Sequence, residues 1–528
     1  MLRSTLVVLL ALLVLPLSAA TVPTGFTDVS LFDLGAPTAL AFTPDGRLLV
    51  TTQGGQLRVY KEGALLATPA LSLGAGVLCS NSERGLLGVA VDPDFASNRF
   101  VYLYYTHVAG GGCMNRVSRF TFNTGTGSDT VDAASELVLV DNMPSPAGNH
   151  NAGDVHFGPD GYLYISIGDG GCDWAGDSGC GGTNDATRDQ HVLTGKILRI
   201  TKTGDIPPEN PFQGAGTARC NVTGQTTAGN KCQETFAWGF RNPFRFAMNP
   251  NRDDTYFFIN DVGQSAWEEI DFGTAGGDFG WNCREGAHTN SATGKCSPTP
   301  PDLVEPFFEY QHGGFVPGTA DNDCGSITGG AFVPDGVWPG YDGTFLFGDF
   351  NCGKIFRITQ GAGGVWTGTR FAVGAGGVTS MVFGPYGVSQ AFYYLTYAGG
   401  GQVHRVSYGP FDFNTLTPCR LVDTRTVGPA LAANSTRTFT ATGVCGVPAT
   451  ATVIAVNVTV IGASSSGDLQ LWPTGTTAPG TSVLSFQAGQ TRANNAFVEL
   501  GASGGFSALA AMPSGSAHLV VDVVGWYE

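Results

Sequence analysis

Charged side chains are scarce in this sequence, at 13% of its 528 residues, which is about half the share found in ordinary soluble proteins. Few Lys and Glu residues are therefore available for long exposed helices, which argues against a mainly helical protein. Asp and Glu number 43 against 27 Lys and Arg, giving a net charge of −16. Because nucleic-acid binding needs clustered basic residues, we expect no nucleic-acid partner.

Long apolar runs are missing beyond the N-terminus, so we expect no membrane span. Residues 1–20 carry Arg3 ahead of a short apolar run at 6–17, followed by small residues at 18–20. This order is typical of a secretory signal peptide, and the run is short for the alternative, a membrane anchor. The sequence therefore predicts a secreted protein, extracellular or periplasmic.

Cysteine pairs of the C-x-x-C type are also absent, although the chain has 12 cysteines. An even number of cysteines in an exported chain favours disulfides over metal-binding thiolates, the alternative interpretation. Spacing does not fix the connectivity, and we expect sequence neighbours to pair. The expected pairs are Cys79–Cys113, Cys172–Cys180, Cys220–Cys232, Cys283–Cys296, Cys324–Cys352 and Cys419–Cys445.

Gly and Pro are abundant, with 77 and 29 residues, while hydrophobic residues still make up 42%. This composition is typical of an all-β protein rich in turns. Two apolar runs around a Pro-centred turn recur six times, and β-branched or aromatic residues flank each turn, which predicts antiparallel hairpins. The six repeats lie at 40–50, 87–105, 155–167, 246–259, 330–347 and 381–395.

Six small sheets that each have two faces to bury predict a six-bladed β-propeller over residues 21–409. A flat sandwich of the same strands is the alternative. Residues 410–528 contain no Lys and have alternating runs at 452–460 and 518–524, which predicts a separate small β-sandwich domain. Through Pro-Cys-Arg-Leu-Val-Asp-Thr-Arg at 418–425, it resembles an accessory domain at the C-terminus of many secreted bacterial proteins.

Strand order in a propeller predicts which residues share one mouth of the central channel. The innermost strand of a blade runs along the channel and the next strand runs back. Residues just before the first strand and just after the second therefore lie on one rim. The residues placed on that rim are Glu83, His150, Asp169, Arg241, Asn242, 261–264 and Asp349.

These residue types favour general acid–base chemistry. Asp169 behind His150 would fix the imidazole tautomer, so that His150 acts as a general base. Arg241 would stabilise negative charge developing on an oxygen atom. Each residue alone has an ordinary structural interpretation, such as a surface pair for Glu83 and Arg84, and their convergence on one mouth is what predicts a site. Covalent hydrolysis is disfavoured because no Ser or Cys nucleophile is evident beside a base.

Four motifs then follow one another on the predicted blades. They are Glu-Arg-Gly-Leu-Leu-Gly at 83–88, His150 with Phe-Gly-Pro-Asp-Gly at 157–161 and Gly-Asp at 168–169, Gly-Lys-Ile-Leu-Arg at 195–199, and Gly-Phe-Arg-Asn-Pro at 239–243. In order and spacing the chain resembles the soluble glucose/sorbosone dehydrogenase family over roughly residues 26–408. This resemblance implies a six-bladed propeller that oxidises an aldose or other polyol, with pyrroloquinoline quinone and calcium as cofactors.

The resemblance also implies catalytic roles. His150 corresponds to the general base that takes the proton of the sugar C1 hydroxyl while hydride passes to the quinone. Asp169 corresponds to the carboxylate that orients this base. Arg241 and Asn242 correspond to the pair that contacts the quinone, with Arg241 polarising its carbonyl.

Further roles concern the cofactor and the substrate. The backbone carbonyls of Gly263 and Gln264 correspond to the calcium ligands that hold the cofactor, and Glu83 stands where glucose-oxidising members place a glutamine at the substrate. The chain departs from the family where members use a Lys after the second strand of blade five and two Arg before the inner strand of blade six. Residues 348–353 and 376–380 contain no basic residue.

Two other functions stay open. The missing basic residues favour a non-catalytic propeller that binds a protein or glycan partner, whereas a channel-centred metal held by carboxylates would favour a calcium-dependent hydrolase such as a lactonase. The favoured interpretation of one acidic loop is a solvated loop pinned by Cys172–Cys180, and a second calcium site is the alternative. This loop contains Asp173, Asp177, Asn184, Asp185 and Asp189. No sequence feature specifies an oligomeric state.

Overall fold

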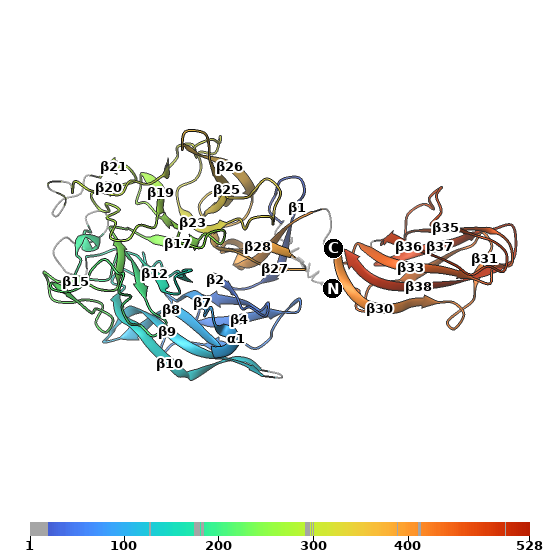
Figure 1. Cartoon of the computed structure of the whole chain (residues 1–528), viewed down its shortest axis with the longest axis horizontal. Helices are drawn as coiled ribbons and strands as arrows, with labels where there is room; N and C mark the ends of the chain where they lie inside the picture. The colour runs from blue at the N-terminus through green and yellow to red at the C-terminus, as the bar shows by residue number, and fades with distance from the viewer. Residues whose placement is uncertain are drawn as a thin grey trace, which may run out of the picture. The chain divides into compact units, whose positions relative to one another are not determined.

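The computed structural model describes residues 19–125, 128–173, 180, 184–290, 296, 298, 300–387, 389–409, 413–501 and 503–527. All but the last two residues of the expected signal peptide lie outside the described residues. The chain divides into two compact units, Met1–Tyr408 and Gly409–Glu528, and strands dominate both (Figure 1). Within the described residues, no helix has the length and apolar character needed to cross a membrane.

The described part of the first unit contains six antiparallel sheets of four or five strands, each built mainly from strands that are consecutive in sequence. From the first strand outward, blade one has β2 (Pro37–Phe42), β3 (Leu48–Thr52), β4 (Gln56–Lys61) and β5 (Ala64–Leu65), with β6 (Leu71–Ser72) also paired to β4, and blade two has β7 (Leu86–Val91), β8 (Phe100–Ala109), β9 (Gly112–Gly125) and β10 (Ser128–Pro144). Blade three has β11 (Val155–Phe157), β12 (Leu163–Ile167), β13 (Lys196–Ile200) and β16 (Thr235–Trp238), and blade four has β17 (Pro243–Met248), β18 (Phe257–Asp261), β19 (Trp267–Phe272) and β22 (Phe308–Gln311). Blade five has β23 (Ile327–Phe332), β24 (Phe345–Asp349), β25 (Lys354–Gln360) and β26 (Trp366–Val373), and blade six has β27 (Val378–Tyr386), β28 (Ser389–Thr396), β29 (Gln402–Tyr408) and β1 (Phe26–Asp33).

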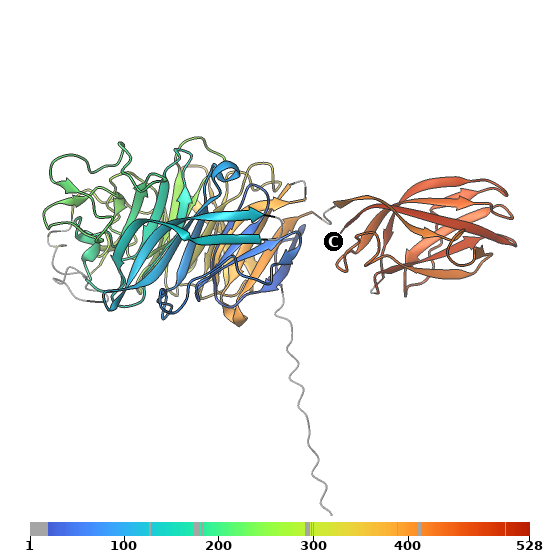
Figure 2. The same cartoon turned by 90° about the horizontal axis from the view of Figure 1, so that it is seen from below.

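The first strands of the six sheets form a closed ring. β2 packs against β7, β7 against β11, β11 against β17, β17 against β23, β23 against β27, and β27 again against β2. Figure 1 shows several of these strands gathered towards the middle of the unit, and Figure 2 shows the sheets from the side. The predicted six-bladed propeller is therefore confirmed, and the flat sandwich is not the fold.

Ring closure depends on a strand that the repeats do not predict. β1 precedes blade one in the sequence but pairs with β29 of blade six, from Phe26 opposite Tyr408 to Asp33 opposite Gln402. Blade six thus combines strands from both ends of the unit. This arrangement joins the two ends of the ring through backbone hydrogen bonds and leaves no gap between the last blade and the first.

Hydrophobic residues fill the spaces between neighbouring blades, because successive residues of a strand point to opposite faces of its sheet. Phe258 of blade four packs with Phe345 and Phe347 of blade five, whereas Ile259 packs with Ile197 of blade three. Near the channel the backbones approach closely. A Cβ atom at Gly88 of β7 would lie 2.1 Å from the carbonyl oxygen of the residue at 153, so only glycine fits there.

The six expected disulfides are all present, and each joins the neighbours proposed from the sequence. No free cysteine lies within the described part of the chain. Five of the bridges belong to the propeller and tie its long loops, and the sixth belongs to the second unit.

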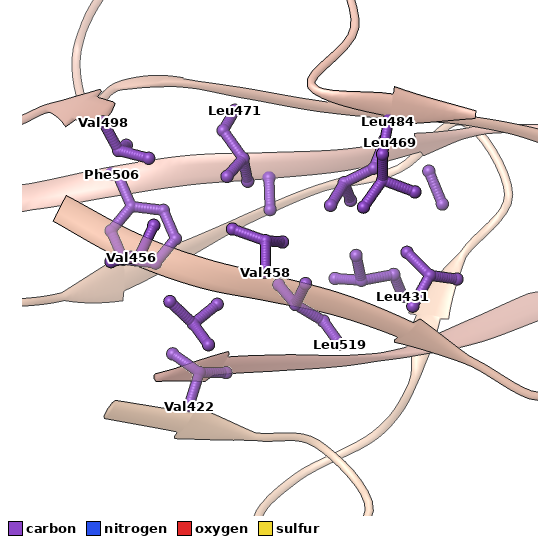
Figure 3. Close-up of a cluster of buried hydrophobic side chains, with 14 of the residues drawn as sticks. Val422, Leu431, Val456, Val458, Leu469, Leu471, Leu484, Val498, Phe506 and Leu519 are labelled. Atoms are coloured by element: carbon purple, nitrogen blue, oxygen red, sulfur yellow. The ribbon is translucent and has the colours of Figure 1, made fainter. Parts of the chain in front are cut away.

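The second unit is a β-sandwich of two antiparallel sheets. One sheet has the order β30 (Phe413–Asp423), β38 (Ser516–Tyr527), β33 (Val453–Ile461) and β36 (Arg492–Glu499), with β31 (Leu431–Ala432) paired to β38; the other has the order β32 (Thr436–Thr440), β37 (Gly505–Ala511), β34 (Gly467–Pro473) and β35 (Leu484–Phe486). Aliphatic side chains and Phe506 fill the space between the sheets (Figure 3). The predicted small β-sandwich is confirmed.

Candidate functional site

A cavity of about 490 Å³ opens at one mouth of the channel, a volume in the usual range of small-molecule sites. Residues from the rims of all six blades line it. Among them are Glu83, His150, Arg241, Asn242, Gly263 and Gln264. Asp169, Asp261 and Asp349 are buried and do not line the cavity. Strand order therefore brought the expected residues to one mouth, with three carboxylates lying behind its wall.

His150 is held by Asp169 through a hydrogen bond of 2.6 Å between Nδ1 and Oδ1. The side chain of Asp169 is fully buried, and it also accepts hydrogen bonds from Trp281 Nε1 and from the backbone N–H of Gly171. Burial alone would raise the pKa of Asp169, but attraction and hydrogen bonding from His150, together with Arg241, hold it below the ordinary value. An ionised Asp169 fixes the proton on Nδ1 and leaves Nε2 as the ring nitrogen for a ligand.

Glu83 lines the cavity and also shapes the His150 loop. The backbone of His150 has a φ of +51°, a conformation that non-glycine residues adopt rarely. Its N–H donates to Glu83 Oε2 at 2.7 Å, and the N–H of Glu83 donates to the carbonyl of Gly148. The neighbouring Arg84 is buried and donates to Ser145, so the interpretation of residues 83–84 as a surface pair is wrong.

Arg241 and Asn242 are positioned from behind by Asp261. The carboxylate of Asp261 accepts hydrogen bonds from the backbone N–H groups of both residues, at 2.9 and 2.6 Å. Burial raises the pKa of Asp261 to about 7 although these N–H groups favour its ionised form. Arg241 Nη1 donates to the carbonyls of Val262 and Gly263, and its buried Nε has no hydrogen-bond partner among the described residues. The guanidinium group of Arg241 thus lines the cavity with one of its N–H donors unsatisfied.

The loop that carries the two expected calcium-binding carbonyls is tightly held. A Cβ atom at Gly263 would lie 1.6 Å from the carbonyl oxygen of Trp267, so residue 263 must be glycine. Glu285 Oε1 accepts hydrogen bonds from successive backbone N–H groups that begin at Gln264. The Gly263 carbonyl accepts from Arg241, so a calcium ion there would share this oxygen with the guanidinium group.

Arg245 also lines the cavity, and it is not among the site residues predicted from the sequence. Its guanidinium group donates to the carbonyls of Thr38 and Phe244 and, at 3.3 Å, of Leu87, so it reaches from blade four to the inner strands of blades one and two. Burial lowers its pKa, and Asp154 opposes this effect. A cationic side chain therefore lies across the channel beneath the cavity. The available signal was a charged residue in the otherwise apolar strand β17.

A second histidine, His312, lines the same cavity and was likewise missed. It follows β22 directly, and its Nε2 lies 2.5 Å from Oε1 of the buried Glu268. The cavity thus has two histidine–carboxylate pairs, one from blade three and one from blade four. The sequence signal was weak, because 44 residues separate the two partners.

The rim of blade five is organised by Asp349. Its carboxylate accepts hydrogen bonds from the Tyr310 hydroxyl and from the backbone N–H groups of Gly325 and Ser326. The Cys324–Cys352 disulfide ties the same two loops. Phe350, Asn351 and Thr379 line the cavity in the stretches where basic residues are missing, so uncharged side chains stand there.

The expectation of a solvated acidic loop is wrong for Asn184, Asp185 and Asp189, which are buried. The short 3-10 helix η2 (Ala186–Arg188) turns this segment inward, and Arg188 donates to both carboxylate oxygens of Asp278. An internal ion pair therefore holds a segment that composition alone assigned to solvent.

Oxygen atoms of Asp173, Asp185 and Asp189 lie within 4.8 Å of one another. Carboxylate oxygens are the ligands that calcium prefers, so a second calcium site at this loop stays an untested alternative. Asp177 lies outside the described residues.

Comparison with known proteins places this geometry in context. The sequence pattern described as "Glucose / Sorbosone dehydrogenase" matches residues 34–377. The HIPL2 protein of Arabidopsis thaliana is 30% identical over 53% of this chain and 44% of its own length. The aldose sugar dehydrogenase YliI of Escherichia coli K12 is 32% identical over 47% of this chain and 59% of its own length.

The chain therefore spans about half the length of these two curated relatives. A solved structure, the PQQ-bound aldose sugar dehydrogenase of Streptomyces coelicolor, superposes with a TM-score of 0.53 at 22% identity. The superposition covers 73% of this chain and 99% of that one. It supports the propeller fold.

Proposed function

Because this chain belongs to the glucose/sorbosone dehydrogenase family, we propose that it is a secreted, quinone-dependent dehydrogenase that oxidises an aldose or other polyol. The observation that carries the proposal is the His150–Asp169 pair, because His150 lines the same cavity as Arg241 while Asp169 holds it from behind the wall. Six disulfides and the N-terminal apolar run support export.

The cavity suits pyrroloquinoline quinone, a tricarboxylate, together with calcium. Arg241 has an unpartnered buried Nε, and Asn242 lies beside it on the lining. The carbonyl oxygens of Gly263 and Gln264 are the type of ligand that calcium takes. When bound, the quinone would supply the acceptor for the hydride, which carries the two electrons removed from the sugar.

The chain's own residues supply the proton chemistry. With Nδ1–H donating to Asp169, Nε2 of His150 is the atom that accepts the proton of the sugar hydroxyl. The ionised Asp169 then compensates the positive charge of the imidazolium. Arg241 stabilises negative charge on an oxygen of the bound ligands.

Titration of the purified apo-protein with pyrroloquinoline quinone and calcium tests the proposal. We expect saturable quinone binding that requires calcium, followed by aldose-dependent reduction of an artificial electron acceptor. Quinone absorbance and acceptor reduction should be recorded together across a panel of aldoses. Absence of quinone binding at every calcium concentration would reject the proposal.

A non-catalytic propeller that binds a protein or glycan is the second candidate. The observation in its favour is the uncharged character of Phe350, Asn351 and Thr379, where family members use basic residues. The same titration separates the two functions, because a binding propeller would leave the acceptor unreduced. The hydrolase is disfavoured because the cationic Arg245 reaches across the channel to carbonyls of blades one and two and would repel a metal ion near it.

A further inference from the structure

The His312–Glu268 pair differs from the His150–Asp169 pair in which ring nitrogen is engaged. His312 bonds its carboxylate partner through Nε2, whereas His150 uses Nδ1. The remaining nitrogen, Nδ1 of His312, has no hydrogen-bond partner among the described residues, and the side chain is a quarter exposed. The His312 ring also lies against Gly325, where a Cβ atom would approach it to 3.3 Å.

Glu268 is a fixed anchor for this histidine. Its side chain is fully buried in β19, and its Oε2 accepts hydrogen bonds from the backbone N–H groups of Ile327 and Gly263. One carboxylate therefore joins three parts of the mouth: the start of β23, the loop after β18, and His312. Such anchoring fixes the imidazole ring before any ligand arrives.

Nδ1 is the ring nitrogen of His312 that is left to contact a ligand. Nε2 is engaged by the buried Glu268, and His312 itself lines the cavity. A polar group of a bound molecule is therefore the partner available to Nδ1.

We infer that His312 is a ligand-binding residue whose Nδ1 forms a hydrogen bond with the molecule bound in the cavity, either with a carboxylate of the quinone or with a hydroxyl of the sugar. This inference rests on the proposed function for the identity of the ligand. It assigns to blade four a polar contact that complements the uncharged rims of blades five and six. Glu268 is a positioning residue, since it acts through His312.

The two amide substitutions at position 312 separate ligand binding from structural support. H312Q places its amide where Nε2 lies, so it keeps the bond to Glu268 and removes the hydrogen-bonding nitrogen at Nδ1. H312N places its amide near Nδ1 and gives up the bond to Glu268. His288→Gln is the matched control, because His288 forms a 3.0 Å pair with Glu309 on the same blade but does not line the cavity.

The dissociation constant of pyrroloquinoline quinone should be measured by absorbance titration with calcium present and without sugar. The Michaelis constant for an aldose should then be measured at saturating quinone. We expect H312Q to raise the quinone dissociation constant about tenfold or more, the usual effect of losing a hydrogen bond to a charged group. H312N should have a smaller effect and H288Q none. An increase confined to the Michaelis constant would show that the group contacted by His312 belongs to the sugar.

Three results would overturn the inference. Unchanged quinone and sugar constants in H312Q, with the wild type binding quinone, would reject it and leave the proposed function standing. Equal weakening in H312N and H312Q, with lowered melting temperatures in both, would assign His312 a structural role. Failure of the wild-type protein to bind quinone would reject the inference together with the proposed function.

Discussion

The propeller and the sandwich bury different kinds of residues. Among residues 413–527, the buried polar side chains in the described part are Thr424 and Ser507, and the core is otherwise apolar. The rim of the propeller buries Asp169, Arg245 and Glu268 close to its cavity. Buried charges cost free energy unless they are paired or hydrogen-bonded, and these three all have such partners. The sandwich has no charged residue among the buried side chains of its described part, so a sheet fold does not by itself require buried charge.

His150→Gln should produce the largest effect, because it removes the base without disturbing the apolar packing. If the protein oxidises sugars, turnover should fall by about 100- to 10,000-fold, while the free energy of unfolding stays nearly unchanged. Steady-state kinetics and denaturant unfolding measure the two quantities. His156→Gln is the control, since His156 also pairs with a carboxylate but lies outside the cavity lining. Undiminished turnover would remove His150 as the base.

Phe506→Ala should destabilise the sandwich and leave the ligand site intact. Phe506 is fully buried between the two sheets, and removing a buried phenyl ring typically costs about 3–5 kcal/mol. Scanning calorimetry should show a lower melting temperature for the second unit alone, with unchanged quinone affinity. Thr438→Ala, on the adjacent strand β32, is an exposed control. A shift of the propeller transition would contradict the separation into two units.

The buried carboxylates should make the propeller less stable as pH rises. Burial, then repulsion from Asp261 and Glu309, raises the pKa of Asp271 well above its usual value, and neither carboxylate oxygen has a partner in the described residues. The native state therefore holds a proton that the unfolded chain releases above about pH 4, so stability falls from pH 5 towards pH 8. Asp271→Asn should gain about 1–3 kcal/mol at pH 8 and little at pH 5.

Asp423 in the sandwich is the control for Asp271, because its pKa is shifted in the opposite direction. A hydrogen bond from Arg425 holds the pKa of Asp423 below its usual value, so its ionised form is favoured in the folded state. Asp423→Asn should therefore give no gain in stability at pH 8. The free energies of unfolding of both variants should be measured by denaturant titration at pH 5 and pH 8. Equal stabilisation by the two substitutions would show that burial does not cause the effect at Asp271.

The smallest expected difference concerns two disulfides that close loops of similar length. Cys324–Cys352 and Cys419–Cys445 span 28 and 26 residues, so their chain-entropy contributions to stability should be nearly equal. Only the first pair adjoins cavity residues, namely Gly325 and Asn351. Replacing the first pair by Ser should raise the quinone dissociation constant severalfold, and replacing the second should leave it unchanged. An equal effect of both replacements on the quinone dissociation constant would contradict a specific role of Cys324–Cys352 in holding the ligand cavity.

Sequence reasoning predicted the blades because their signals are local. Each Pro-centred turn and its flanking apolar runs specify one hairpin, and hairpin geometry alone brings His150 to Asp169 across β11 and β12. The same rule placed Arg241 at this mouth. The roles assigned to these residues stay predictions, whereas their positions follow from strand order.

The missed features depend on contacts between distant segments. β1 has no local signal for pairing with β29, and His312 meets Glu268 through a loop and a neighbouring strand. Arg245 is held by carbonyls of two other blades, which no pattern within β17 encodes. The acidic loop is buried because of an ion pair with Asp278, and its composition alone favours solvent.

Because Phe26 pairs with Tyr408, blade six forms only after the ribosome has made almost all of the first unit. At roughly 5–20 residues per second, β1 emerges tens of seconds before its partner strand. During this interval β1 and the last finished blade present open strand edges, which are able to pair with other chains. The cavity takes residues from all six blades, so it is completed in the step that closes the ring. A nascent chain that binds its ligand has therefore finished assembling the propeller.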